Sequence, residues 1–175
     1  PAMACGNAVI LKPSEETSST AHLLAEVMDE VGIPKGAFNL ILGRGKNVGD
    51  PITSHPGIDA VTFTGASSTG QRIMKSAAPT VKPISFELGG KNSAIVFDDA
   101  DLDKAIAGVA RSTFTNCGQV CLCTEKVYVH KNIAEKFIAG LKQQAQDIKI
   151  GYPTDNDVFM GPLVSKVHQQ KVLSY

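Results

Sequence analysis

Short apolar runs alternate with segments of helical periodicity along most of this 175-residue chain, and glycines or polar loops separate them. The runs that predict strands are 8–11, 38–42, 59–64, 81–88, 93–97 and 127–129. The segments that predict helices are 18–31, 48–54, 67–78, 99–114 (or 101–114), 133–148 and one that starts after Ser165. Strands that alternate with helices at this spacing indicate an α/β fold built on a parallel sheet.

The Gly89-Gly90 pair is the best candidate for a domain boundary, which divides the chain into 1–89 and 90–175. Helical spacing predicts buried stripes in three of the helices. The stripes are Leu23, Leu24, Val27 and Val31; Leu102, Ile106, Val109 and Phe114; and Ile133, Phe137, Leu141 and Ile148.

Charge and hydropathy exclude several classes of protein. The chain has 17 basic and 17 acidic residues, so nothing favours a nucleic-acid or anionic-membrane partner. No apolar run approaches the length of about 18 residues that a membrane span needs. Asn7 and Lys12 interrupt the apolar start, so no signal peptide is expected. Because the chain starts at Pro1 and ends at Tyr175 inside a predicted helix, we expect a piece of a longer protein.

Four cysteines are present, and Cys117, Cys121 and Cys123 cluster within seven residues. This spacing does not suit a disulfide framework, and it lacks the paired C-x2-C units typical of zinc sites. The four histidines also show no metal spacing. We therefore expect no metal site, and free thiols in a reducing cytoplasm.

Two segments carry the chemistry. Glu87-Leu88-Gly89-Gly90-Lys91 offers a carboxylate where a strand runs into a glycine turn. The segment 116–123, Asn-Cys-Gly-Gln-Val-Cys-Leu-Cys, offers thiols in a Gly/Gln loop between a helix and a strand. A thiol can attack carbon, and a carboxylate can take a proton from water, so together they could make and hydrolyse a thioester.

Four collinear strings resemble the NAD(P)-dependent aldehyde dehydrogenase family over essentially the whole chain. They are Leu11-Lys12-Pro13-Ser14-Glu15, Phe63-Thr64-Gly65, Glu87-Leu88-Gly89-Gly90-Lys91 and Gly118-Gln119-Val120-Cys121. The resemblance implies that 1–89 is part of a Rossmann-like NAD-binding domain and that 90–175 begins an α/β catalytic domain. It also implies that this piece by itself is inactive, because other family residues lie outside it.

By resemblance, Cys121 is the nucleophile and Glu87 is the base that activates water. Without the family match, a cysteine packed as a small hydrophobe and a strand-end carboxylate in a salt bridge would be the better interpretations. The family gives Cys117 and Cys123 no chemistry, so we expect them to pack. A weaker hypothesis is a reversible inactivating bridge between Cys123 and Cys121.

The resemblance also implies a cofactor site for NAD, with NADP possible. Lys12 and Glu15 would hold the adenosine ribose, and a carboxylate there repels a 2′-phosphate, which favours NAD. The implied cofactor-binding residues are Lys12, Ser14, Glu15, Gly43, Thr64, Gly65, Ser67, Gly70, Leu88 and Gly89. The family commonly has serine where this chain has Ala66, so Ser67 or backbone amides would contact phosphate. A solvated pair of charges near a helix start is the alternative for Lys12 and Glu15, and an ordinary strand-to-helix turn is the alternative for Gly43.

The resulting hypothesis is oxidation of an aldehyde substrate to a carboxylic acid by a homodimer or homotetramer. The segment 116–123 looks like that of the subgroup acting on muconic semialdehydes, and enzymes of betaine aldehyde and other aliphatic aldehydes are also close. A non-catalytic nucleotide-binding or structural protein on the same scaffold is one alternative. A cysteine-rich metal module is another.

Overall fold

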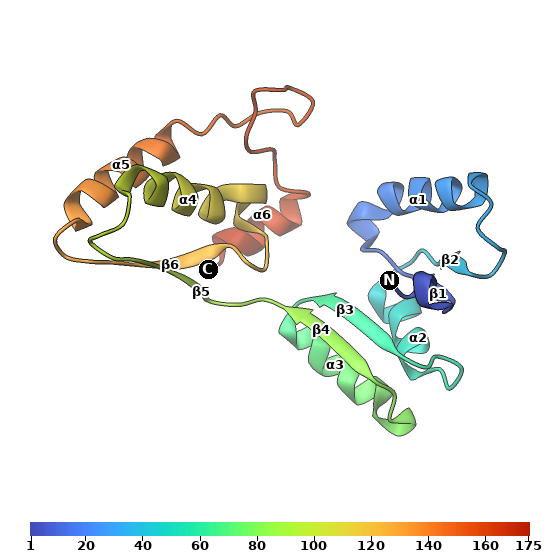
Figure 1. Ribbon diagram of the computed structural model, residues 1–175. Helices are drawn as coiled ribbons and strands as arrows, with labels where there is room; N and C mark the ends of the chain where they lie inside the picture. Colours follow the sequence, from blue (N-terminus) through green and yellow to red (C-terminus); the bar gives the residue numbers. More distant parts are fainter. The chain divides into compact units, whose positions relative to one another are not determined.

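The computed structural model describes residues 1–175, which form two compact units, Pro1–Glu87 and Leu88–Tyr175 (Figure 1). Each unit combines helices with paired strands, which confirms the α/β class. The division falls two residues before the boundary placed after Gly89. That the units are a cofactor domain and a catalytic domain stays a prediction. No helix in the structure has the length and apolar character needed to cross a membrane.

The first unit begins with a strand–helix–strand segment. Its elements are η1 (Met3–Cys5), β1 (Val9–Leu11), η2 (Glu15–Thr17), α1 (Ser18–Glu30) and β2 (Phe38–Leu40). The two strands are parallel, with Val9 opposite Phe38 and Leu11 opposite Leu40. Gly32 follows α1 with a left-handed φ of 78°, which a glycine adopts without strain, so it ends the helix as predicted.

The apolar stripe predicted on α1 is not buried. Ala21 is the buried residue of this helix, whereas the stripe residues are between 41% (Leu24) and 67% (Val31) exposed. The sheet beside α1 consists of two strands of 3 residues each, so it is too small to cover the whole stripe. Helical periodicity identified the apolar face correctly, but it does not say what covers that face.

The rest of the first unit is a second strand–helix–strand segment. Its elements are η3 (Gly45–Gly49), α2 (Asp50–Ser54), β3 (Val61–Gly65), α3 (Ser67–Ala77), η4 (Ala78–Thr80) and β4 (Ile84–Leu88). β3 and β4 are neighbours, and the rings of Phe63 and Phe86 meet edge to face with centroids 6.3 Å apart. Such aromatic pairs favour close strand packing.

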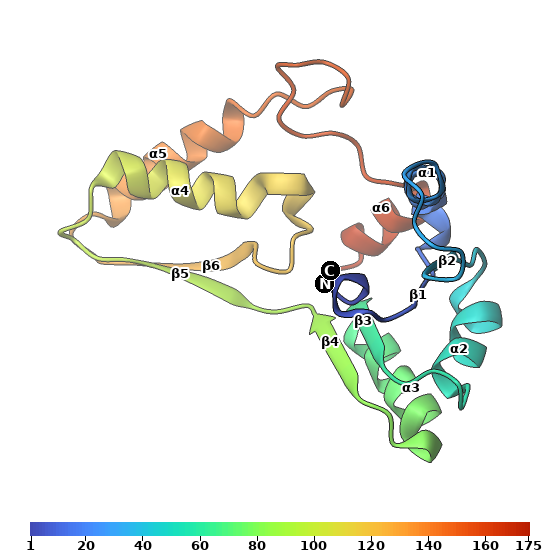
Figure 2. The ribbon, with the colours of Figure 1, turned by 45° about the vertical axis from the view of Figure 1, so that its right-hand side comes forward.

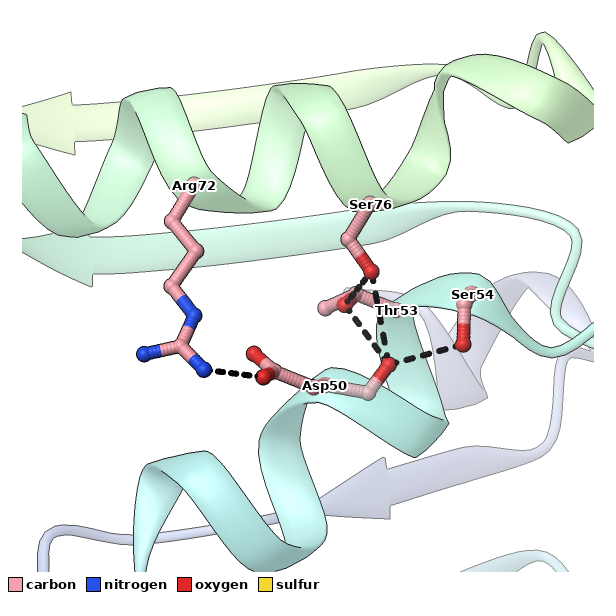
Figure 3. A network of polar contacts seen from close by, with 5 residues as sticks. All are labelled: Asp50, Thr53, Ser54, Arg72 and Ser76. Atoms are coloured by element: carbon pink, nitrogen blue, oxygen red, sulfur yellow. Dashed lines mark hydrogen bonds and ion pairs between the residues drawn. The ribbon is translucent and has the colours of Figure 1, made fainter.

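A polar network joins α2 to α3 (Figure 3). The hydroxyl of Thr53, a residue only 6% exposed, donates to the Asp50 carbonyl at 3.1 Å and contacts the Ser76 hydroxyl at 3.0 Å. Arg72 pairs with the Asp50 carboxylate, and the Ser54 hydroxyl donates to the Asp50 carbonyl at 2.9 Å. Because buried hydroxyls are costly without partners, this network keeps the two helices in register.

The second unit packs two helices on a parallel strand pair (Figure 1 and Figure 2). Its elements are β5 (Asn92–Val96), α4 (Leu102–Phe114), η5 (Thr115–Gly118), β6 (Thr124–Val129), α5 (Ala134–Gln146) and α6 (Lys166–Leu173). Ser165 caps α6, as predicted, by accepting from the His168 N–H at 3.2 Å. Asp101 caps α4, and its contacts with Lys104 lower the pKa of this carboxyl.

Val96, Ile106, Val109 and Phe137 form the core of this unit. Their neighbours in the core include Leu102, Ile133 and Leu141, so most of the two predicted stripes is confirmed. Phe114 is only partly buried, and Ile148 lies beyond the end of α5. The sheet and the two helices therefore hold the segment that connects α4 to β6.

We expect Phe137→Ala to lower the free energy of unfolding by about 3–5 kcal/mol, because Phe137 is 1% exposed and its removal leaves a cavity. Chemical denaturation followed by circular dichroism measures this change. Phe97→Ala is the matched control, since Phe97 is 64% exposed and should cost less than about 1 kcal/mol. Equal losses from the two substitutions would contradict this assignment of the core.

Candidate functional site

The cysteine loop, residues 116–123, connects α4 to β6 through an unusual backbone. Asn116, Cys117 and Gly118 are consecutive residues with left-handed φ values of 51°, 57° and 71°. For a residue with a side chain, this conformation costs on the order of 1–2 kcal/mol, and it persists only where the surroundings enforce it. The loop is therefore held in shape by contacts from outside.

The three thiols of the cysteine loop differ in exposure. Cys121 is exposed, Cys117 is intermediate and Cys123 is only 5% exposed; all three are free. The Cys123 thiol lies 3.7 Å from the Thr115 carbonyl, and the Cys117 thiol donates to the Gly161 carbonyl at 3.3 Å. Cys121 is thus the thiol of this loop that an outside molecule can reach. Its role as the nucleophile stays a prediction.

Two side chains outside the cysteine loop also contact it. The Asn92 amide donates to the carbonyls of Cys121 at 2.5 Å and of Cys123 at 3.1 Å. The ring nitrogen Nε2 of His168 lies 2.8 Å from the Gln119 amide oxygen. Asn92 is not among the site residues predicted from the sequence, and its place directly after Gly89-Gly90-Lys91 is the one local signal of a role. His168 joins α6 to the loop.

Lys91 pairs with Glu125 across the start of the β5–β6 pair, at 2.6 Å. Its hydrogen bond to Glu125 is the main cause that raises the pKa of Lys91 above 10.5. A raised pKa means that this pair stabilises the fold at pH values below 10.5 and that the contribution is lost as the pH rises through the folded-state pKa. The contact is structural, and it lies beside Asn92.

Glu87 lies near the end of β4 and is exposed. The strand alternates, with Ile84, Phe86 and Leu88 partly buried and the residues between them exposed. Its exposure therefore follows from the period of the strand. Glu87 is the last residue of the first unit, and Leu88 and Gly89 open the second. That Glu87 acts on a thioester at Cys121 stays a prediction.

Lys12 and Gly43, both predicted to bind cofactor, are brought together by the β1–β2 pair. The Lys12 ammonium donates to the carbonyls of Gly43 at 3.0 Å and of Pro13 at 2.5 Å, which leaves its third N–H free. Ser14 accepts from the Glu16 N–H at 3.3 Å, and Glu15 is exposed next to it at the start of η2. An ammonium donor and a carboxylate acceptor fit the hydroxyls of a ribose.

Gly43 and Gly65 also have a packing reason to be glycine. A Cβ on Gly43 would lie 2.5 Å from a Val48 methyl, and one on Gly65 would lie 2.6 Å from the Phe63 ring. Both residues also have positive φ, at 146° and 157°. An ordinary strand-to-helix turn therefore explains these glycines without any ligand.

The start of α3 is where the sequence predicted a contact with phosphate, and this contact stays a prediction. Thr64, Gly65 and Ser67 are exposed there, and Ala66 occupies the N-cap position without a side-chain hydrogen bond. The first N–H groups of a helix have no intrahelical partner, so an uncapped start can bind an anion. Gly70, one turn further, is buried, and its role in binding a cofactor stays a prediction.

An open hollow of about 270 Å³ lies between α4 and the cysteine loop. Its lining includes Arg111, Val120, Leu122 and Cys123, but not Cys121. No group of three or more His, Cys, Asp or Glu side chains is placed to hold a metal ion.

This chain is similar to a family of known proteins in both its sequence and its fold. A family model described as "Aldehyde dehydrogenase family" matches residues 1–175. Two similar relatives are a 2-aminomuconic 6-semialdehyde dehydrogenase of Pseudomonas sp, 54% identical, and a 2-hydroxymuconic semialdehyde dehydrogenase of Pseudomonas sp. (strain CF600), 53% identical. In both alignments all of this chain matches 36% of the relative, so the chain spans about a third of their length.

A solved structure of betaine aldehyde dehydrogenase from Staphylococcus aureus, in complex with NAD+, is also similar. It superposes with a TM-score of 0.91 at 43% identity, over 96% of this chain and 33% of its own. A variant of that enzyme has been solved with NAD+ and a BME-modified cysteine. The match to the family model over the full length, together with these relatives, shows that the chain belongs to the aldehyde dehydrogenase family.

Proposed function

We propose that the protein containing this chain oxidises an aldehyde to a carboxylic acid with NAD. The observation that carries the proposal is Cys121, an exposed and free thiol in a loop with an enforced backbone, within a chain of the aldehyde dehydrogenase family. A packing cysteine would be buried, as Cys123 is. The BME-modified cysteine of the similar S. aureus enzyme supports a reactive thiol in such a protein.

In the proposed reaction, the Cys121 thiolate attacks the carbonyl carbon, forming a C–S bond and a tetrahedral thiohemiacetal oxyanion. The backbone N–H of Cys121 makes no hydrogen bond within the chain, so it is free to donate to this oxyanion. Bound NAD+ supplies the acceptor for the hydride that leaves the same carbon with its electron pair. Loss of hydride restores the carbonyl as a thioester on Cys121.

Glu87 completes the proposed reaction by removing a proton from water, which then attacks the thioester carbonyl. The C–S bond breaks, Cys121 leaves as thiolate and the acid is released. An exposed carboxylate at a strand end can reach solvent, as a base for water must. Overall, one aldehyde, one water and one NAD+ give the acid, NADH and a proton.

For the substrate, we propose a muconic semialdehyde. The support is the similarity to the two Pseudomonas semialdehyde dehydrogenases, at 54% and 53% identity, against 43% for the betaine aldehyde enzyme. Betaine aldehyde is the second candidate, because the fold superposes closely on that enzyme. We further propose a homodimer or homotetramer, and a cytoplasmic location that suits four free cysteines.

The test is a panel of aldehydes, including 2-hydroxymuconic semialdehyde and betaine aldehyde, assayed with NAD on the full-length protein. We expect the highest kcat/KM for the semialdehyde, with the corresponding acid and NADH formed in equal amounts. A protein that binds NAD but oxidises no aldehyde would support the alternative of a non-catalytic nucleotide-binding protein. Higher kcat/KM for betaine aldehyde would favour the second substrate.

Cofactor preference gives a separate prediction on the same protein. If the exposed Glu15 carboxylate accepts from the ribose hydroxyls, Glu15→Gln removes its repulsion of a 2′-phosphate. We expect the ratio of kcat/KM with NAD to that with NADP to fall by about tenfold, measured with saturating aldehyde. Glu16→Gln, which changes the exposed neighbour in η2, should leave the ratio within about twofold. An unchanged ratio in Glu15→Gln would remove Glu15 from the cofactor site.

A further inference from the structure

We propose that Asn92 is a positioning residue for Cys121, an inference that rests on the proposed role of Cys121 as the nucleophile. The Asn92 amide is the side chain that contacts Cys121 directly, and it does so across 29 positions of sequence. The amide nitrogen Nδ2 donates to the Cys121 carbonyl at 2.5 Å and to the Cys123 carbonyl at 3.1 Å. Both partners are acceptors, so the NH₂ end of the amide must face them.

The contact acts on the orientation of the thiol. Fixing the carbonyl of Cys121 restricts the ψ angle of that residue and so the direction of its Cα–Cβ bond. The same peptide segment carries the N–H proposed to hold the oxyanion. A displacement of about 1 Å of a reacting group can cost about 100-fold in rate. A clamp on this carbonyl therefore positions both the nucleophile and the oxyanion donor.

Asn92 is itself well anchored. It is partly buried at the start of β5, where it pairs with Thr124, the first residue of β6. The register shifts between Asn92 and Ser93, so that Ser93 pairs with Lys126. The ion pair of Lys91 with Glu125 lies next to this irregularity, at 2.6 Å. The register irregularity therefore lies at the residue whose side chain reaches the end of the cysteine loop.

The opposite end of the loop explains why such a clamp is needed. Asn116 and Cys117 are in the left-handed region, and the Cys117 thiol and the Gln119 amide are tied to Gly161 and His168. These contacts hold the loop from Cys117 to Gln119, but none reaches Cys121. Asn92 supplies the contact at the reactive residue itself.

The experiment uses the full-length protein with Asn92→Asp and Asn92→Ser. Asp keeps the size of the side chain but replaces the donors by a charge that repels the two carbonyls, and Ser shortens the donor. Asn132→Asp is the matched control, because Asn132 is exposed in the same unit and bonds Asp98 instead, at 3.1 Å. We expect kcat to fall by about 10–100-fold in both Asn92 variants, with KM for NAD and the thermal midpoint close to wild type.

A second readout does not depend on turnover. Alkylation of Cys121 by iodoacetamide, followed by peptide mass spectrometry, should slow by about threefold to tenfold in Asn92→Asp, because the introduced carboxylate disfavours the nearby thiolate. Asn132→Asp should label at the wild-type rate. A wild-type protein that shows no turnover would overturn the proposed function. The difference in labelling rate would still show whether residue 92 affects the Cys121 thiol.

Three results would overturn the role of Asn92. One is a kcat and labelling rate within twofold of wild type in both variants. Another is a loss of kcat that is matched by a lower thermal midpoint and restored on cooling. Failure of both variants to fold would also overturn it, since Asn92 would then serve stability and not position.

Discussion

Cys121→Ser is expected to abolish aldehyde oxidation by the full-length protein, with kcat at least about 1,000-fold lower. A hydroxyl is a far weaker nucleophile than a thiolate at neutral pH, and it cannot form the thioester on which the proposed reaction depends. The substitution removes no buried contact, because Cys121 is exposed. Stability should therefore be unchanged, and NADH formation is the measurement.

Cys5→Ser is the matched control for this experiment. Cys5 is the other exposed cysteine, and it lies in η1 of the first unit. Its replacement should leave kcat within about twofold. If Cys121→Ser kept more than a tenth of the wild-type rate, the thiol would not be the nucleophile and the proposed reaction would fail. Binding of NAD, measured by fluorescence, should survive in both variants.

Glu87→Gln should block the second half of the reaction and spare the first. We expect kcat to fall by about 100–10,000-fold, the range lost when a general base is removed. Attack by Cys121 and hydride loss should continue, so one equivalent of NADH should form per active site before turnover stops. Stopped-flow fluorescence measures this burst, and intact-protein mass spectrometry should detect the acyl group on Cys121.

Glu135→Gln provides the matching control for Glu87. Glu135 is an exposed carboxylate in the first turn of α5, outside the proposed site. It should show wild-type turnover with no accumulated thioester. Absence of both burst and acyl group in Glu87→Gln would place Glu87 in the first half-reaction. Undiminished turnover would mean that another residue of the full-length protein activates water.

Local patterns predicted the elements well because helices, strands and caps depend on residues close together in sequence. The stripes around Ile106 and Phe137 identified the core of the second unit, and Ser165 capped the last helix. The period of β4 determined that Glu87 faces outward while Phe86 packs. Each of these properties follows from repeat length and short-range hydrogen bonding.

Other properties depend on partners far away in the chain, and no local pattern records them. The stripe of α1 was expected to be buried, yet the short β1–β2 pair does not cover it. Lys12 reaches the Gly43 carbonyl across 31 positions, and the glycines at 43 and 65 are required by Val48 and Phe63. The packing reasons for these glycines appear only when the side chains are in place.

The sequence alone determined that this is an α/β chain with a thiol at 121 and a carboxylate at 87, because strand and helix periods and the four motifs can be read along the chain. Only the tertiary structure decided which thiol is accessible and what holds it. Cys121 and Cys123 are two residues apart and Asn92 donates to both of their carbonyls, but Cys123 is buried and the Cys121 thiol is exposed. Burial and clamping are set by the strand register and by helix packing, which bring together residues that the sequence keeps apart.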